Sequence, residues 1–137
     1  MRFADRLHVD LRIAPDALEA AVPHLCLQPI VENAIRHGIE ASASAGELII
    51  SARRTRGRLE LVVEDDGPGF RSMRLPVGIG LANTRLRLDE LYGDRASLTL
   101  ANALDGGAIV TMTLPFRECE EPAAPRAEAL IRKAAVP

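Results

Sequence analysis

Apolar residues alternate with polar ones along five stretches of the chain, and this period of two is typical of β-strands with one buried face. The clearest stretch is residues 58–64, with three apolar side chains on one side and two glutamates on the other. Glycine-containing turns at residues 55–57 and 105–107 predict that two pairs of these strands form antiparallel hairpins. The other four stretches are residues 7–13, 48–54, 98–102 and 108–114.

Three further stretches predict helices. A short helix is expected to begin at Pro15 and to end before Pro23, because proline suits the first turn of a helix and disrupts its interior. Residues 25–39 repeat apolar positions at helical spacing, with a bend or an early turn expected at Pro29. The third helix follows a pair of glycines, and its leucines recur with a period near seven along residues 81–91.

The composition limits the class of protein. A chain of 137 residues that is 47% hydrophobic and 26% charged suits one globular domain. The net charge of -2 and the 3% aromatic content speak against a nucleic-acid-binding surface and against direct contact with a membrane. The two cysteines lack metal-site spacing and are expected to stay reduced. No signal peptide is recognisable, which predicts a cytoplasmic location.

The strand and helix pattern ends near Phe116. We therefore expect residues 1–116 to form the domain and residues 117–137, which are rich in alanine, glutamate and proline, to form a poorly ordered tail.

A short loop whose residues could bind a ligand follows the strand at residues 58–64. It reads Asp65-Asp66-Gly67-Pro68-Gly69-Phe70. Glycines allow backbone to approach a ligand closely, and a carboxylate at a strand end suits a small flat group that carries an N–H donor. Taken alone, the loop is more commonly an ordinary turn, since Asp-Gly and Pro-Gly are frequent turn formers.

The helix expected at residues 25–39 has a polar face. Glu32, Asn33, Arg36 and His37 fall within an arc of about 140°. An amide oxygen can bind Mg²⁺, and an arginine is a partner for phosphate. The more common interpretation of such a face, taken alone, is simple contact with solvent.

Gly78 and Gly80 precede the third helix. A glycine-rich segment at a helix N-terminus can bind an anion, because free N–H groups and the positive end of the helix dipole point at it. Only residues 71–77 separate this segment from the aspartate loop, so we expect them to form a mobile lid.

Together, the three motifs resemble those of the Bergerat-fold nucleotide-binding superfamily, which includes gyrase, MutL and the sensor histidine kinases. The polar helix resembles the N box, residues 65–69 resemble the G1 box and residues 78–81 resemble the G2 box. Residues 27–38 and 78–88 are similar to those of LytS-like sensor histidine kinases, and the resemblance covers roughly residues 7–116.

The resemblance implies the fold and the ligand. The expected fold is α+β: a two-layer sandwich with a mixed, mostly antiparallel sheet of about five strands and helices on one face. ATP would lie between the helices and the sheet. Asp65 would accept the adenine amino hydrogen, while Gly67 and Gly69 let the base lie close. The N–H groups at Gly80 and Leu81, with Gly78 before them, would hold phosphate.

The resemblance also implies a metal side of the site. Asn33 would bind Mg²⁺, which bridges the phosphates, and Glu32 would orient the metal shell or pair with Arg36. Arg36 would contact phosphate, and His37 the phosphate or the ribose. Less certain nucleotide contacts are assigned to Asn83 and Arg85.

Two positions depart from the superfamily pattern. Pro29 stands where the ATPase branches carry a catalytic glutamate, so the chain lacks the usual water-activating base. Ala108 stands where many relatives have threonine, so one adenine-side hydrogen bond is either missing or supplied by Thr111.

The implied function is that of the catalytic domain of a sensor histidine kinase. It would transfer the γ-phosphate of ATP to a histidine on a separate upstream dimerisation segment, with a response regulator downstream. No histidine of this chain has the expected acceptor context. The alternatives are an anti-sigma-factor-type serine kinase, a regulatory nucleotide-binding module and a degenerate domain that only docks. Whether the parent protein is anchored in a membrane stays open.

Overall fold

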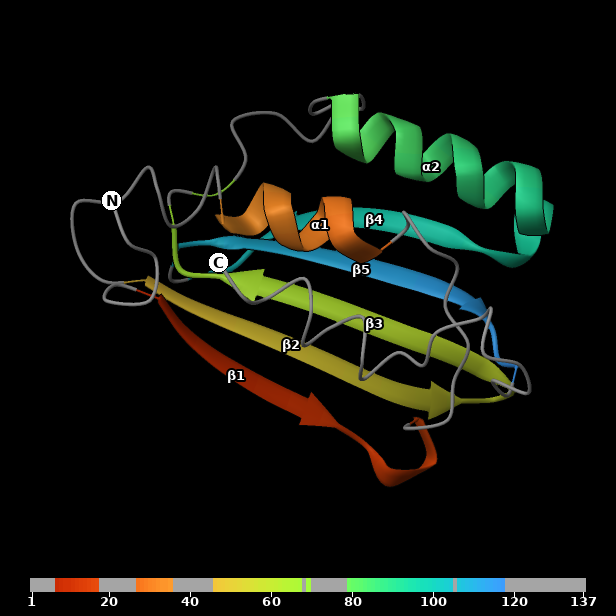
Figure 1. The fold of residues 1–137 in the computed structure, drawn as a ribbon, viewed down its shortest axis with the longest axis horizontal. Coiled ribbons are helices and arrows are strands. Elements are labelled where there is room, and N and C mark those ends of the chain that lie inside the picture. Colours follow the sequence, from red (N-terminus) through yellow and green to blue (C-terminus); the bar gives the residue numbers. More distant parts are fainter. Residues whose placement is uncertain are drawn as a thin grey trace.

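The computed structural model describes residues 7–17, 27–35, 46–67, 69, 79–104 and 106–117. These residues form a five-stranded sheet with helices along one face (Figure 1). The strands are β1 (Leu7–Ile13), β2 (Gly46–Thr55), β3 (Arg58–Asp65), β4 (Ser97–Asn102) and β5 (Ala108–Pro115). The helices are α1 (Leu27–Asn33) and α2 (Ile79–Tyr92), with short 3₁₀ turns at Pro15–Ala17 and Gly93–Arg95.

The strand order in the sheet is β1-β2-β3-β5-β4. Only β1 and β2 run parallel, and every other neighbouring pair is antiparallel. The predicted two-layer α+β sandwich with a mixed, mostly antiparallel sheet is therefore confirmed.

The β2–β3 hairpin shows how local sequence determines a turn. Arg56 and Gly57 are the two turn residues, with φ values of 52° and 74°. Two successive left-handed residues give a turn whose twist matches that of the flanking strands, which favours a tight two-residue connection.

The core lies between the sheet and the helices. Side chains in β2, β3 and β5 alternate between buried and partly exposed, and the buried ones face the helical layer. The largest fully buried side chains come from both layers: Ile30, Leu48, Ile50, Leu59, Leu61, Leu81, Leu88, Met112 and Leu114.

The leucines of α2 do not all face the core. Leu91 is 51% exposed, whereas Thr84 is buried at 1% exposure. The buried stripe runs through Leu81, Thr84 and Leu88, at spacings of three and four residues. At the end of the helix, the half-buried Tyr92 packs against the core instead of Leu91.

α1 is described over a shorter span than the predicted 25–39. It continues after Asn33 in a wider turn at residues 34–35, and residues 36–39 lie outside the described part of the chain. Pro29 is the third residue of α1 as described, and the residues just before Leu27 lie outside the described part of the chain, so the expected bend or early turn stays a prediction. The first N–H groups of a helix have no intrahelical partner, so proline loses no hydrogen bond there.

Two further predictions concern residues that the structure does not describe. The lid at residues 71–77 and the tail beyond Arg117 lie outside the described part of the chain. Among the described helices, none combines the length and the apolarity needed to cross a bilayer.

Candidate functional site

Asp65 is the last residue of β3, a strand that lies between β2 and β5 in the sheet. It shares the buried face of Val63, and only 9% of the residue is exposed. Its Oδ1 accepts hydrogen bonds from the N–H of Gly67 at 2.9 Å and from the N–H of Ala108 at 3.4 Å. Among the described residues, the donors that contact this carboxylate both reach Oδ1, and none is recorded at Oδ2.

Burial raises the pKa of the Asp65 carboxyl above its usual value of 3.8. The N–H groups of Gly67 and Ala108 oppose this rise, while the neighbouring charge of Asp66 adds to it. A buried carboxylate of this kind favours a ligand that donates a hydrogen bond to it, because the donor stabilises the ionised form.

Two glycines beside Asp65 are required by close packing. Gly69 has φ +81°, and a Cβ there would lie 2.7 Å from Oδ1 of Asn102. Gly107 has φ +94°, and a Cβ there would overlap the backbone carbonyl oxygen of Asp65. From the sequence, Gly69 was expected to let the base lie close. The structure shows in addition that Gly69 packs against Asn102, the last residue of β4. The role of Gly107 was missed, although the Gly106-Gly107 pair was a visible signal.

Ala108 contributes backbone only, through the N–H that donates to Asp65. The suggestion that Thr111 supplies a side-chain hydrogen bond in its place is wrong. Side chains of a strand alternate between faces, so Ala108 and Thr111, three residues apart, lie on opposite sides of β5. Thr111 pairs with Val62 and Thr99 across the sheet.

The C-terminal end of α1 lies near the end of the sheet that carries Asp65. Because β1 and β2 are parallel, the chain between them must return along the sheet, and α1 lies on that return (Figure 1). The C-terminal end of α1 is thus directed towards the end where β2 begins and β3 stops. α2 begins above α1, packs against it and runs towards the opposite end of the sheet (Figure 1).

Asn33, the last residue of α1, is half-buried and Glu32 is exposed. Their predicted partners Arg36 and His37 lie outside the described residues. A single amide oxygen fits Mg²⁺ when phosphates and water complete its shell. The described residues contain no cluster of three or more His, Cys, Asp or Glu that would hold a metal by itself.

The glycine-rich segment lies at the start of α2, as predicted, but the helix begins one residue before Gly80. Gly78 lies outside the described residues. The Leu81 side chain is buried at 1% exposure, so only its backbone is left to meet an anion. The first four N–H groups of a helix have no partner within it, which keeps this end suitable for phosphate.

The two residues of α2 that were expected to contact the nucleotide lie in different environments. Asn83 is exposed. Arg85 donates from Nη1 to the carbonyl oxygen of Leu98 at 3.3 Å, which ties α2 to β4. A nucleotide contact by either residue stays a prediction.

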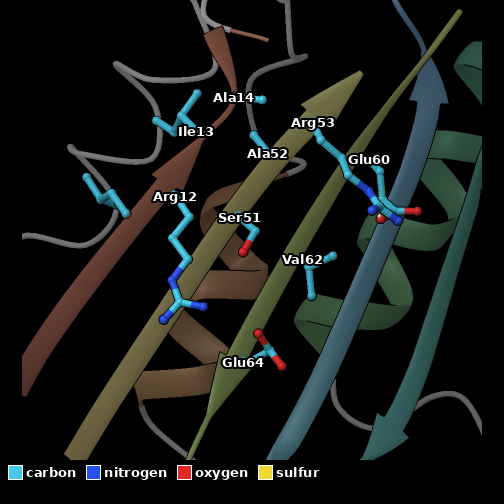
Figure 2. A pocket seen from close by; sticks show the side chains of 10 residues that line it. Arg12, Ile13, Ala14, Ser51, Ala52, Arg53, Glu60, Val62 and Glu64 are labelled. Carbon is cyan, nitrogen blue, oxygen red and sulfur yellow. Dashed lines mark hydrogen bonds and ion pairs between the residues drawn. The ribbon is translucent and has the colours of Figure 1, made fainter. Parts of the chain in front are cut away.

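A groove of about 710 Å³ lies on the other face of the sheet, away from Asp65 (Figure 2). Arg12, Ser51 and Glu64 line it on β1, β2 and β3, and helices lie behind these strands in this view. An ion pair between Arg53 Nε and Glu60 Oε1, 2.8 Å apart, lies among the residues that line it. Among the described residues, none of the site residues expected from the sequence lines this groove.

Comparison with known proteins shows which family the chain belongs to. The family model described as "Histidine kinase-, DNA gyrase B-, and HSP90-like ATPase" matches residues 20–118. "Sensor protein LytS" of Oceanobacillus iheyensis is 33% identical over 134 residues, covering 88% of this chain and 23% of that protein. "Sensor histidine kinase BtsS" of Escherichia coli K12 is 35% identical over 117 residues, covering 85% of this chain and 21% of the relative.

Solved structures agree on the fold. The histidine kinase domain of the Erythrobacter litoralis EL346 blue-light activated histidine kinase aligns with a TM-score of 0.62 at 23% identity, over 80% of this chain and 52% of that one. The catalytic domain of histidine kinase ThkA aligns with a TM-score of 0.61 at 17% identity, over 83% of this chain and 82% of that one.

This chain spans only 23% and 21% of the two curated relatives, so it corresponds to one part of such proteins. The resemblance inferred from the three motifs is confirmed. The chain belongs to the family of histidine kinase-, DNA gyrase B- and HSP90-like ATPases, and the relatives that it resembles within that family are sensor histidine kinases.

Proposed function

We propose that this chain is the ATP-binding catalytic domain of a two-component sensor histidine kinase. The observation that carries the proposal is the buried Asp65 carboxylate, whose Oδ1 is held by Gly67 and Ala108 while Oδ2 has no donor among the described residues. A carboxylate fixed in this way is a preorganised acceptor for the amino group of adenine, because no reorganisation is needed when the base arrives.

The phosphates then extend towards the helical layer. The free N–H groups at the start of α2, around Gly80 and Leu81, meet a phosphate at the positive end of the helix dipole. Arg36, His37 and Gly78 are proposed to add contacts there. Asn33 offers its amide oxygen to Mg²⁺, which neutralises phosphate charge when bound.

The acceptor is proposed to be a histidine on a separate helical segment of the parent protein, with a response regulator as the next phosphate carrier. Pro29, in the first turn of α1, provides no carboxylate to activate water. The site therefore positions ATP for another nucleophile better than it catalyses hydrolysis, since phosphoryl transfer depends mainly on positioning and electrostatic stabilisation. We place this activity in the cytoplasm, with residues 1–116 as the domain and residues 117–137 as a tail.

The test is to incubate the isolated chain with γ-labelled ATP and Mg²⁺, with and without a histidine-bearing helical segment from a sensor kinase. We expect ATP to bind, phosphate release to be slow, and acid-labile label to appear only on the added segment. Removing a general base typically lowers a rate by about 10²–10⁴-fold. Fast phosphate release that Asn33→Ala abolishes would show that the chain is an ATPase instead. Label on His8, His24 or His37 would contradict a separate acceptor.

A further inference from the structure

The loop that carries Asp65 is fastened to β2 on one side. The exposed Asp66 accepts, through Oδ1, a hydrogen bond from the N–H of Glu47 at 3.0 Å. In the β2–β3 ladder the last pair is Leu48 with Asp65. The Asp66 side chain therefore extends the attachment between the two strands by one residue, just after the backbone ladder stops.

The same loop rests against the β4–β5 turn on its other side. Gly107 is buried, and a Cβ on it would overlap the carbonyl oxygen of Asp65, so a side chain could not fit there. A Cβ on Gly69 would lie 3.2 Å from the carbonyl oxygen of Gly107. The turn is braced internally, because Ala103 donates to Gly107 O at 3.0 Å and Gly106 donates to Ala103 O at 3.2 Å.

These two attachments restrict where the Asp65 carboxylate can lie. Hydrogen bonds weaken steeply when their geometry is distorted, so a small shift of the loop weakens a bond from a bound base. Adenine presents an amino donor at the position where guanine presents a carbonyl oxygen. A site that holds a carboxylate firmly at that position therefore discriminates between the two bases, and a loosened site discriminates less.

We propose that Asp66 and Gly107 are positioning residues that hold the Asp65–Gly69 loop between β2 and the β4–β5 turn, and that this hold sets the preference for adenine over guanine nucleotides. The inference rests on the proposed ATP-binding function. It assigns neither residue a contact with the nucleotide; both act through Asp65.

The experiment measures the dissociation constants of ATP and GTP, each with Mg²⁺, by calorimetry. The variants are Asp66→Ala, Asp66→Asn and Gly107→Ala, and the control is Asp89→Ala, which removes an exposed acid from α2. Asp66→Ala and Asp66→Asn both remove the negative charge beside Asp65, but the asparagine keeps an oxygen that accepts from Glu47. Comparing them isolates the hydrogen bond from the charge.

We expect Asp66→Ala to lower the ratio of the GTP to the ATP dissociation constant about three- to ten-fold, the effect of one lost hydrogen bond. Asp66→Asn and Asp89→Ala should keep the wild-type ratio, and Gly107→Ala should lower it further. If Gly107→Ala does not fold, the two Asp66 variants decide alone.

Two results would overturn the inference while leaving ATP binding intact: a wild-type ratio in folded Asp66→Ala, or equal losses in Asp66→Ala and Asp66→Asn. A purely structural role would weaken ATP and GTP binding by the same factor and leave the ratio unchanged. Absence of ATP binding by the wild-type chain would instead overturn the proposed function, and this inference with it.

Discussion

The carboxylate of Asp65 accepts a hydrogen bond from the N–H of Ala108, which lies 43 residues further along the chain. This bond joins the end of β3 to the beginning of β5, so the position of the acid depends on how the sheet assembles. The proposed adenine site is thus built from two distant segments that the strand order β3-β5 brings together.

Stability should depend on pH through Asp65. Its pKa is raised in the folded state by burial, so the folded chain holds this proton more tightly than the unfolded chain does. The stabilisation from this group is fully present below the unfolded value of 3.8 and is lost as the pH rises through the folded value.

The measurement is the free energy of unfolding of the wild type minus that of Asp65→Asn, from urea titrations between about pH 4 and 8. Groups that titrate alike in both proteins cancel in this difference. We expect the difference to fall as the pH rises and then to level off. A difference that is constant or that grows with pH would show that burial does not raise the pKa of Asp65.

Asn33→Ala should weaken nucleotide binding only when Mg²⁺ is present, because the amide is assigned to the metal and not to the base. Titrating a non-hydrolysable ATP analogue with Mg²⁺ and then with a chelator separates the two contributions. Equal losses in both conditions would mean that Asn33 supports α1 structurally, which its half-buried position also allows.

Leu88→Ala should destabilise the fold by about 2–5 kcal/mol, the usual cost of a cavity at a buried leucine. Leu88 is 1% exposed, and Leu86, two residues earlier on α2, is 61% exposed and serves as the matched control. Leu86→Ala should change the free energy of unfolding by no more than about 0.5 kcal/mol. Similar losses at both positions would contradict the described orientation of α2.

The sequence pattern predicted all five strands correctly, because alternation along a strand is a local property that survives into the folded state. The position of Asp65 at the end of β3 was predicted for the same reason. The suggestion about Thr111 was an avoidable error, since the three-residue spacing from Ala108 already places the two side chains on opposite faces.

Contacts between distant segments could not be predicted in this way. The packing of Gly107 against Asp65 and the bond from Glu47 to Asp66 depend on which strands are neighbours. The burial of Thr84 and the exposure of Leu91 depend on where α2 crosses the sheet. Such information lies in the assembled fold, and no periodicity along the chain contains it.

The most direct test of the account is a calorimetric titration of the wild type and of Asp65→Asn with ATP and with GTP. The asparagine keeps the shape of the side chain, but an NH₂ group replaces one carboxylate oxygen and the negative charge is lost. Loss of a charged hydrogen bond should weaken ATP binding by about 1.5–3 kcal/mol, with a smaller effect on GTP binding. Unchanged ATP affinity in a folded Asp65→Asn protein would contradict the assignment of Asp65 to the adenine base.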